Sequence, residues 1–290
     1  MTGDFKAKRH GKPNRRPLAA LFLLAALLSA LRWGNTSIET ERFTFASAEL
    51  PAGFDGYRVV VLTDLHGRRF GKNGEALLAA VEEQSPDLIF LVGDLVDERT
   101  EDAAGYAASL GAALTGLAPT YFVTGNHEWA RGTEDTERVK TALLGSGVTV
   151  LSNEFCALTR GGDAVVLAGI DDPNGYADQK TPETLAAELY AAYGDPFWVL
   201  LAHRNDRFAD QYSLLGADLT VSGHGHGGCI RLPLTDGLIG TRHELFPSYT
   251  AGFYTENGAD LFVSRGLGNV GRTFRMFNRP QVAVITLERG

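Results

Sequence analysis

Short apolar runs rich in β-branched residues alternate with helix-like stretches through most of this chain, and no other feature restricts its fold as strongly. Strands that alternate with helices predict an α/β domain in which helices cover both faces of a largely parallel sheet. The runs expected to form strands are 57–64, 88–94, 120–126, 164–172, 197–203 and 219–224, and those expected to form helices are 73–84, 103–114, 133–144 and 181–193. Two later runs, 260–268 and 281–288, have no helix between them and indicate a second sheet or an antiparallel extension. No linker and no internal repeat divides residues 51–290, so one domain is expected.

Most of the predicted strands end in residues that can bind a metal ion. In an open α/β sheet, ligands gather where the carboxyl ends of the strands leave a crevice. A single residue of this kind could have another explanation, since Asp94 could cap a helix and His203 could be a hydrogen-bonded histidine at a strand edge. Coincidence does not account for the whole set, which is Asp64, His66, Asp94, Asn126, His127, His203, His224 and His226.

The segment SGHGHGG, residues 222–228, holds two of these histidines among glycines. It could be a surface turn that contains two histidines by chance. Alternatively, the glycines allow the backbone to crowd around a site into which both rings point. The strand-end pattern favours the second interpretation.

The side chains in this set indicate which ions they would bind. Carboxylate, amide carbonyl and imidazole ligands without thiolate suit borderline divalent ions such as Mn, Fe, Co or Zn. A lone Mg²⁺ would prefer mostly oxygen and water. The set is too large for one open catalytic ion and suits two ions if one carboxylate bridges them. Two ions ~3.5–4 Å apart form the clamp used for in-line displacement at phosphorus.

The N-terminus has a different character. Residues 1–33 contain seven Lys or Arg and one acidic residue, and an uncharged apolar run occupies residues 18–31. A buried core helix fits this run poorly, because the run has no polar face and follows a cationic tail. The pattern predicts a secretory signal or a signal anchor, and we favour an uncleaved anchor in the cell membrane. Arg15–Arg16 could belong to a twin-arginine signal or could only set orientation. The positive-inside rule then places everything after Trp33 on the extracytoplasmic side.

The rest of the chain is acidic. The net charge is −8, and residues 34–290 alone carry −14, with no basic stripe. This distribution argues against nucleic acid as the main partner. The two cysteines, Cys156 and Cys229, are too few for a disulfide framework; they could form one bond or be two buried thiols.

Five short motifs together resemble the calcineurin-like metallophosphoesterases. They are DLH (64–66), GD (93–94), GNHE (125–128), AH (202–203) and GHGH (223–226), and the resemblance extends from about Leu50 to the C-terminus. The flanking segments are similar to a bacterial branch with an N-terminal anchor or export signal, whose members include cell-wall-associated phosphoesterases and enzymes that cleave UDP-diacylglucosamine. The resemblance implies a two-sheet sandwich flanked by helices over residues 51–290, preceded by a lead-in segment (34–50) and the basic tail and anchor helix (1–33).

The resemblance also assigns roles to the residues. It implies that Asp64, His66, Asp94 and His226 hold one metal ion, that Asp94, Asn126, His203 and His224 hold the other, and that His127 is the free catalytic histidine. A hydroxide bridging the ions would attack phosphorus. Two departures from the branch, Cys229 in place of glutamine and HRND in place of His-x-Pro, remove no ligand and leave the substrate preference open.

The expected function is therefore that of a dimetal phosphohydrolase that cleaves a phosphodiester or pyrophosphate bond, with a lipid-linked or wall-linked phosphate ester among the candidate substrates. The alternatives are a non-catalytic metal-binding scaffold of the same fold and a nuclease. Arg265, Arg272 and Arg275 could hold a substrate phosphate or could form a solvated basic loop.

Overall fold

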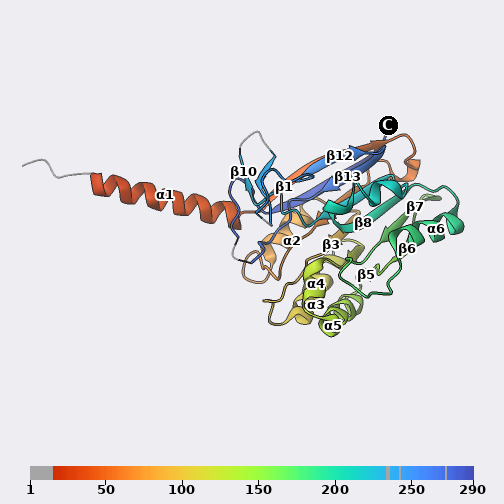
Figure 1. Ribbon diagram of the computed structural model, residues 1–290, viewed down its shortest axis with the longest axis horizontal. Coiled ribbons are helices and arrows are strands. Elements are labelled where there is room, and N and C mark those ends of the chain that lie inside the picture. The colour runs from red at the N-terminus through yellow and green to blue at the C-terminus, as the bar shows by residue number, and fades with distance from the viewer. Residues whose placement is uncertain (1–15, 233–235, 242, 272) are drawn as a thin grey trace, which may run out of the picture.

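The computed structural model describes residues 16–232, 236–241, 243–271 and 273–290. The basic tail predicted at residues 1–15 and the candidate phosphate ligand Arg272 lie outside the described residues. The apolar run forms the helix α1 (Arg16–Thr36), which extends away from the body of the molecule (Figure 1). Among the described helices, none is both long and apolar enough to cross a membrane. The anchor therefore stays a prediction.

Two six-stranded sheets form the body, which confirms the predicted α/β fold and the second sheet. Both sheets are mixed: their central strands run parallel, whereas β14 is antiparallel to β2 and the edge strands β12 and β6 are antiparallel to their neighbours. In order, the first sheet contains β1 (Glu39–Ser47), β14 (Gln281–Arg289), β2 (Arg58–Leu62), β3 (Leu88–Val92), β4 (Thr120–Val123) and β5 (Thr149–Val150). The second contains β12 (Gly252–Glu256), β13 (Ala259–Val263), β9 (Leu219–Gly223), β8 (Trp198–Arg204), β7 (Asp163–Gly169) and β6 (Glu154–Arg160).

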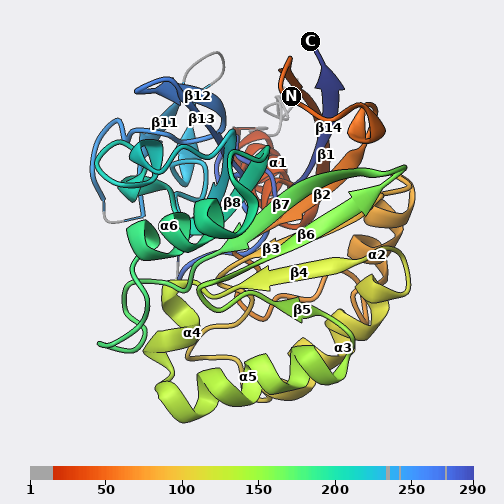
Figure 2. The same ribbon diagram turned by 90° about the vertical axis from the view of Figure 1, so that its right-hand side faces the viewer.

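Helices cover the outer face of each sheet, so the body has four layers (Figure 2). The first sheet packs against α2 (Glu75–Glu82), α3 (Ala103–Thr115) and α5 (Thr133–Gly145), and the second packs against α6 (Pro182–Tyr193). All four helices were predicted. The remaining elements are the short helix α4 (Asn126–Ala130), the turns η1 (Ala52–Phe54), η2 (Asn205–Arg207) and η3 (Tyr212–Leu214), and a separate strand pair, β10 (Ile230–Arg231) and β11 (Gly237–Ile239).

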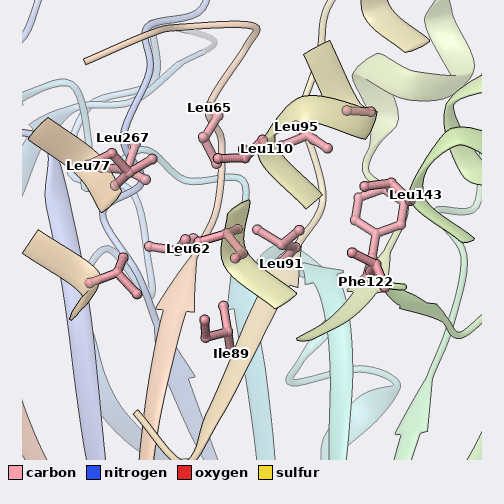
Figure 3. Close-up of a cluster of buried hydrophobic side chains, with 14 of the residues drawn as sticks. Leu62, Leu65, Leu77, Ile89, Leu91, Leu95, Leu110, Phe122, Leu143 and Leu267 are labelled. Carbon is pink, nitrogen blue, oxygen red and sulfur yellow. The ribbon is translucent and has the colours of Figure 1, made fainter. Parts of the chain in front are cut away.

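The central strand β3 of the first sheet is apolar without a break because both of its faces are covered. Side chains alternate between faces along a strand. In β3, Ile89 and Leu91 therefore point to the helices (Figure 3), while Leu88, Phe90 and Val92 point to the second sheet. Burial of each such large side chain stabilises the fold by about 1.5–3 kcal/mol. This packing rigidly supports the loops that follow the strands.

The first strand lies in the predicted lead-in segment. β1 pairs in parallel with β14 over all nine of its residues, from Glu39 opposite Gln281 to Ser47 opposite Arg289. Because β14 lies between β1 and β2, the lead-in segment is held in the sheet by the C-terminal strand of the described domain.

Candidate metal centre

The structure brings the predicted ligands to one edge of the sandwich. Each sheet contributes the loops that follow its central strands, so the site lies where the carboxyl ends of the two sheets meet. Asp64 and His66 follow β2, Asp94 follows β3, Asn126 and His127 begin α4 just after β4, His203 is the penultimate residue of β8, and His224 and His226 follow β9.

One group of four buried residues could hold a metal ion. It consists of Asp64, His66, Asp94 and His226, whose ligand atoms all lie within 4.8 Å of one another. The Nε2 atoms of His66 and His226 are 3.1 Å apart, and His226 Nε2 is 3.2 Å from Asp64 Oδ1. Ring nitrogens and carboxylate oxygens therefore converge on one small volume.

A second group shares Asp94 with the first and adds His203 and His224. His203 Nε2 lies 3.1 Å from Asp94 Oδ2 but has no partner in hydrogen-bond geometry, and the Oδ1 atom of Asn126 is also buried without a partner. His203 Nδ1 donates to the carbonyl oxygen of Val92 at 2.9 Å, which leaves the Nε2 lone pair available. Buried polar atoms are rarely left without a partner, so these atoms fit a cation.

The electrostatics of the two groups also fit a cation. Burial lowers the pKa of His66 to about 3, so this imidazole is neutral, as a metal ligand must be. Burial opposes protonation of His203 as well, but the neighbouring Asp94 carboxylate raises its pKa to about 10. The Asp94 carboxylate therefore favours a positive charge at this point of the cluster.

The backbone around the ligands is strained. Asp64, His66, Asp94, His224 and His226 all have positive φ, between 49° and 67°. For an L-residue this left-handed conformation costs roughly 1–2 kcal/mol. Such strain persists only where the surrounding structure enforces it, and it gathers at functional sites.

Glycine allows the strand ends to approach one another. A Cβ atom on Gly93 would lie 2.5 Å from His203 Nδ1, and one on Gly223 would lie 2.6 Å from Asp64 Oδ2. The glycine beside His224 is therefore needed for close packing of the site, which is the second of the two interpretations of SGHGHGG.

His127 lies at the edge of the site and is partly exposed. Its ring centroid is 4.8 Å from that of His66, and its Nδ1 atom is 2.8 Å from Glu98 Oε2. Its backbone N–H donates to Asp94 Oδ1 at 2.8 Å. Burial lowers the pKa of His127, but the carboxylates of Asp94 and Glu98 outweigh this effect and raise it overall.

Glu128 is a supporting residue that sequence reasoning did not assign, although it is part of the GNHE motif. It is fully buried and accepts hydrogen bonds from the backbone N–H groups of Asp94, Val96 and Gly125 at 2.9, 3.0 and 2.7 Å. Burial and the Asp94 carboxylate raise its pKa to about 7. Glu128 therefore ties the loop after β3 to the loop after β4.

Two arginines contact the histidine ligands, and neither contact was predicted. Arg204 Nη1 lies 3.3 Å from His224 Nε2, and the same guanidinium is paired with the buried Asp172. Arg275 Nη2 lies 3.3 Å from His226 Nδ1. Arg204 directly follows the ligand His203 in the HRND segment, whereas no sequence motif links Arg275 to His226, because that contact depends on the folded loops.

The predicted roles of the basic loop need correction. Arg275 is buried and donates to the carbonyl oxygens of Gly268 and Arg265, and Arg265 is buried against Glu39 and Glu41. Neither side chain is solvated, and neither is free for a substrate phosphate. The cysteines are both free thiols, and Cys229 is buried.

A cleft of 420 Å³ opens beside His224. Its other lining residues come from the loop after β8 (Asn205, Asp206), from Gly225, and from Thr241, Glu244 and residues 247–250. A substrate in this cleft would lie next to the second group of ligands.

Comparisons with known proteins show which family this chain is similar to. The model of the calcineurin-like phosphoesterase family matches residues 57–228. The uncharacterized metallophosphoesterase YkuE from Bacillus subtilis is 29% identical over 259 residues, which cover 87% of this chain and 86% of YkuE. The phosphodiesterase YaeI from Escherichia coli is 29% identical over 239 residues, which cover 80% of this chain and 82% of YaeI.

Two further proteins are similar over part of their length. A Danio rerio protein described as a transmembrane protein with a metallophosphoesterase domain is 29% identical, and the match covers 83% of this chain and 55% of that protein. The sulfate thiohydrolase SoxB from Thermus thermophilus superposes with a TM-score of 0.50 at 13% identity, covering 82% of this chain and 57% of SoxB, which shows the fold alone. The family match covers more than half of the chain, and together with the buried Asp–His clusters it indicates that the site binds divalent metal ions. This chain belongs to the calcineurin-like phosphoesterase family and is a hydrolase of phosphoric ester bonds.

Proposed function

We propose that the protein is a dimetal phosphohydrolase that cleaves a phosphodiester or pyrophosphate bond. The observation that supports this proposal best is that two ligand groups share one buried carboxylate, Asp94. A shared carboxylate keeps two ions close enough to act on one phosphoryl group. Each ion would be Mn, Fe, Zn or Co, as the mixed N and O ligand set favours.

The residues divide into two ligand sets. Asp64, His66, Asp94 and His226 would hold one ion, and Asp94, Asn126, His203 and His224 would hold the other. When bound, the two ions would lower the pKa of a water nucleophile and offset the negative charge on the phosphoryl oxygens.

His127 would act on the leaving group. Its Nδ1 atom is held by Glu98, so Nε2 is the nitrogen left to deliver a proton to the leaving oxygen. A positioned proton donor of this kind typically contributes ~10²–10⁴-fold to the rate.

The N-terminal segment would attach this activity to the cell membrane, with the catalytic domain on the extracytoplasmic side. In this proposal residues 1–33 are the tail and anchor, 34–50 the lead-in, and 51–290 the catalytic domain. The exposure of apolar side chains along α1, such as Leu21, Phe22 and Leu23, supports attachment. A lipid-linked or wall-linked phosphate ester would be within reach of an enzyme attached in this way.

A hydrolysis screen tests the proposal. Metal-stripped protein is reloaded with Mn²⁺, Fe²⁺, Zn²⁺ or Co²⁺ and offered diesters, pyrophosphates and monoesters, with His203→Ala as the ligand variant and His243→Ala, an exposed histidine outside the two groups, as the matched control. We expect metal-dependent turnover that His203→Ala abolishes and His243→Ala retains. A folded, metal-loaded protein without turnover on any ester would instead be a scaffold, and preferential cleavage of DNA or RNA would make it a nuclease.

A further inference from the structure

Four large apolar side chains are exposed near the cleft. They are Leu245, Phe246, Phe274 and Phe277, whose exposed fractions are 67, 75, 50 and 66%, and we call them the apolar rim. Phe246 and Phe277 have φ values of 54° and 52°, which are unusual for a bulky residue. Exposed apolar residues that are grouped, rather than scattered singly, mark an interaction surface.

The rim belongs to a small sheet that borders the cleft. Ile230 of β10 forms bridges to Ile239 of β11 and to Met276, and Ile239 forms a further bridge to Leu245. The four rim residues are therefore carried by neighbouring backbone segments. Glu244 and Pro247, on either side of Leu245 and Phe246, line the cleft beside His224.

The end of α1 is fixed to the same loops. The side chain of Asn35 accepts from the backbone N–H of Arg275 at 2.8 Å and donates to its carbonyl oxygen at 2.9 Å. Arg275 lies between Phe274 and Phe277 in the sequence. In Figure 1, α1 accordingly meets the body beside β10.

The exposed side chains of α1 indicate which environment surrounds this helix. Residues 21–24 are four consecutive exposed apolar residues, so they surround the helix instead of forming one stripe. A groove on a protein partner would match one stripe, whereas a helix that is apolar on all sides suits the interior of a bilayer. The apolar run ends at Arg32 and at Trp33, which is 58% exposed with the Arg279 guanidinium 4.5 Å above its ring. Tryptophan and arginine at the end of an apolar helix are typical of the membrane–water interface.

Trp33 and Asn35 are two residues apart, and Asn35 is bound to the loops that carry the rim. A membrane–water interface at Trp33 therefore lies at the level of these loops.

The direction of the strands also places the metal centre near this interface. β1 starts at Glu39, directly after α1, and it is parallel to β14, which is antiparallel to β2. The carboxyl end of β2, and with it the metal centre, is therefore at the end of the sheet where α1 joins.

We infer that the apolar rim contacts the surface of a lipid bilayer, and that the cleft beside His224 opens toward that surface and takes a phosphate ester presented by the membrane. The bilayer contact rests on the placement of α1 and the rim. The substrate class also rests on the proposed phosphohydrolase function.

Fluorescence quenching tests the contact without requiring turnover. Leu245→Trp is compared with Leu214→Trp, because both leucines are 67% exposed. Leu214 lies on η3, which precedes the amino end of β9, whereas His224 of the cleft follows the carboxyl end of β9. The full chain is reconstituted in vesicles of phosphatidylcholine and phosphatidylglycerol, with or without brominated phosphatidylcholine. We expect the bromine to quench the added tryptophan of Leu245→Trp, and of Phe277→Trp as a second rim variant, but not that of Leu214→Trp. Equal quenching at both positions, or none at the rim in vesicles that contain the protein, would overturn the bilayer contact.

Turnover tests the substrate class. The double variant Leu245→Ser/Phe246→Ser is compared with Leu214→Ser on a phosphate diester embedded in the same vesicles and on a soluble aryl diester. Removing one buried apolar side chain changes an equilibrium constant about tenfold or more, so the ratio of bilayer to soluble turnover should fall at least about tenfold in the rim variant alone. An unchanged ratio would show that the substrate comes from solution. Quenching at the rim without hydrolysis of any ester would leave the bilayer contact standing and refute the phosphohydrolase function.

Discussion

Asp94→Asn distinguishes two roles of the shared carboxylate, which are its hydrogen bonding within the fold and its proposed binding of both metal ions. In the structure, Asp94 Oδ1 accepts a hydrogen bond from the His127 N–H, and Asp94 Oδ2 lies 3.1 Å from His203 Nε2. Asparagine has the same shape, keeps one oxygen for the N–H, and presents an amide that can donate to His203 Nε2. We therefore expect the metal-free variant to fold. Because both ligand groups lose their common carboxylate, it should bind neither ion, whereas His66→Ala alters only one group and should keep the other ion.

The same substitution has a calculable effect on pH-dependent stability. In the wild type, the pKa of His203 rises from about 6.5 in the unfolded chain to about 10 in the folded protein. Because the pKa of His203 is higher in the folded protein, the contribution of His203 to stability is fully present below a pH of about 6.5. This contribution is lost as the pH rises to about 10. Between these limits the free energy of unfolding should fall by up to about 1.4 kcal/mol per pH unit. Asp94→Asn removes the main cause of the shift, so its slope should be shallower by about that amount.

The assay is denaturant unfolding of metal-stripped wild type and Asp94→Asn from about pH 7 to about pH 9.5, with metal analysis of both proteins after reloading. Groups that titrate in this range without an influence of Asp94, such as the Cys229 thiol, cancel in the difference. Asp94 also raises the pKa values of His127 and Glu128, so the lower end of the pH range includes their contributions and the slope toward about pH 9.5 reports His203. Equal slopes would refute the coupling between Asp94 and His203. Retention of both ions by Asp94→Asn would refute the bridge.

Three further predictions concern single residues. Glu98→Gln keeps a hydrogen-bond acceptor for the ring of His127 but removes the charge that helps to raise the pKa of His127. The limb of the pH–rate profile that reports protonated His127 should therefore move to lower pH. The control Glu101→Gln, at an exposed position, should leave this limb in place. His127→Asn should retain both metals but lose ~10²–10⁴-fold in kcat with poor leaving groups and much less with nitrophenolate; loss of metal would instead make His127 a ligand. Gly93→Ala should destabilise the protein by about 3 kcal/mol or more in denaturant unfolding and lower its metal content. Gly132→Ala, at a similar positive φ with open space around it, should cost only about 1–2 kcal/mol. Equal losses of stability would show that the backbone conformation, and not the steric clash, accounts for the effect.

The sequence was sufficient to predict the sandwich and the position of the candidate ligands. Strands buried on both faces need unbroken apolar residues, and the loops after them need side chains for the site, so both signals lie in short local windows. Asp64, Asp94 and His203 could be found in this way because each directly follows or ends an apolar run.

Features that depend on distant pairing were not predicted. β1 reads ETERFTFAS, in which only Phe45 becomes buried, so its local pattern is weak and its strand form depends on β14 more than 230 residues later. Glu98 and Arg275 act on His127 and His226 through loops whose closure no single window encodes. The apolar rim was not predicted for the same reason, because it is assembled by bridges between residues that are distant in the sequence.

The pairing of β1 with β14 has a consequence for how the protein is made. The second strand of the first sheet, β14, is synthesised after all the other described strands, and until it emerges β1 lacks its described sheet partner and β2 has an open edge. Contacts between residues this far apart in the chain form late and slowly. The first sheet of the nascent chain is therefore incomplete during synthesis and during any export. A stop codon or a bulky tag that disturbs residues 281–289 would then leave β1, which follows α1, without the one sheet partner it has among the described strands. The end of α1 would be held to the body by contacts such as those between Asn35 and Arg275 instead.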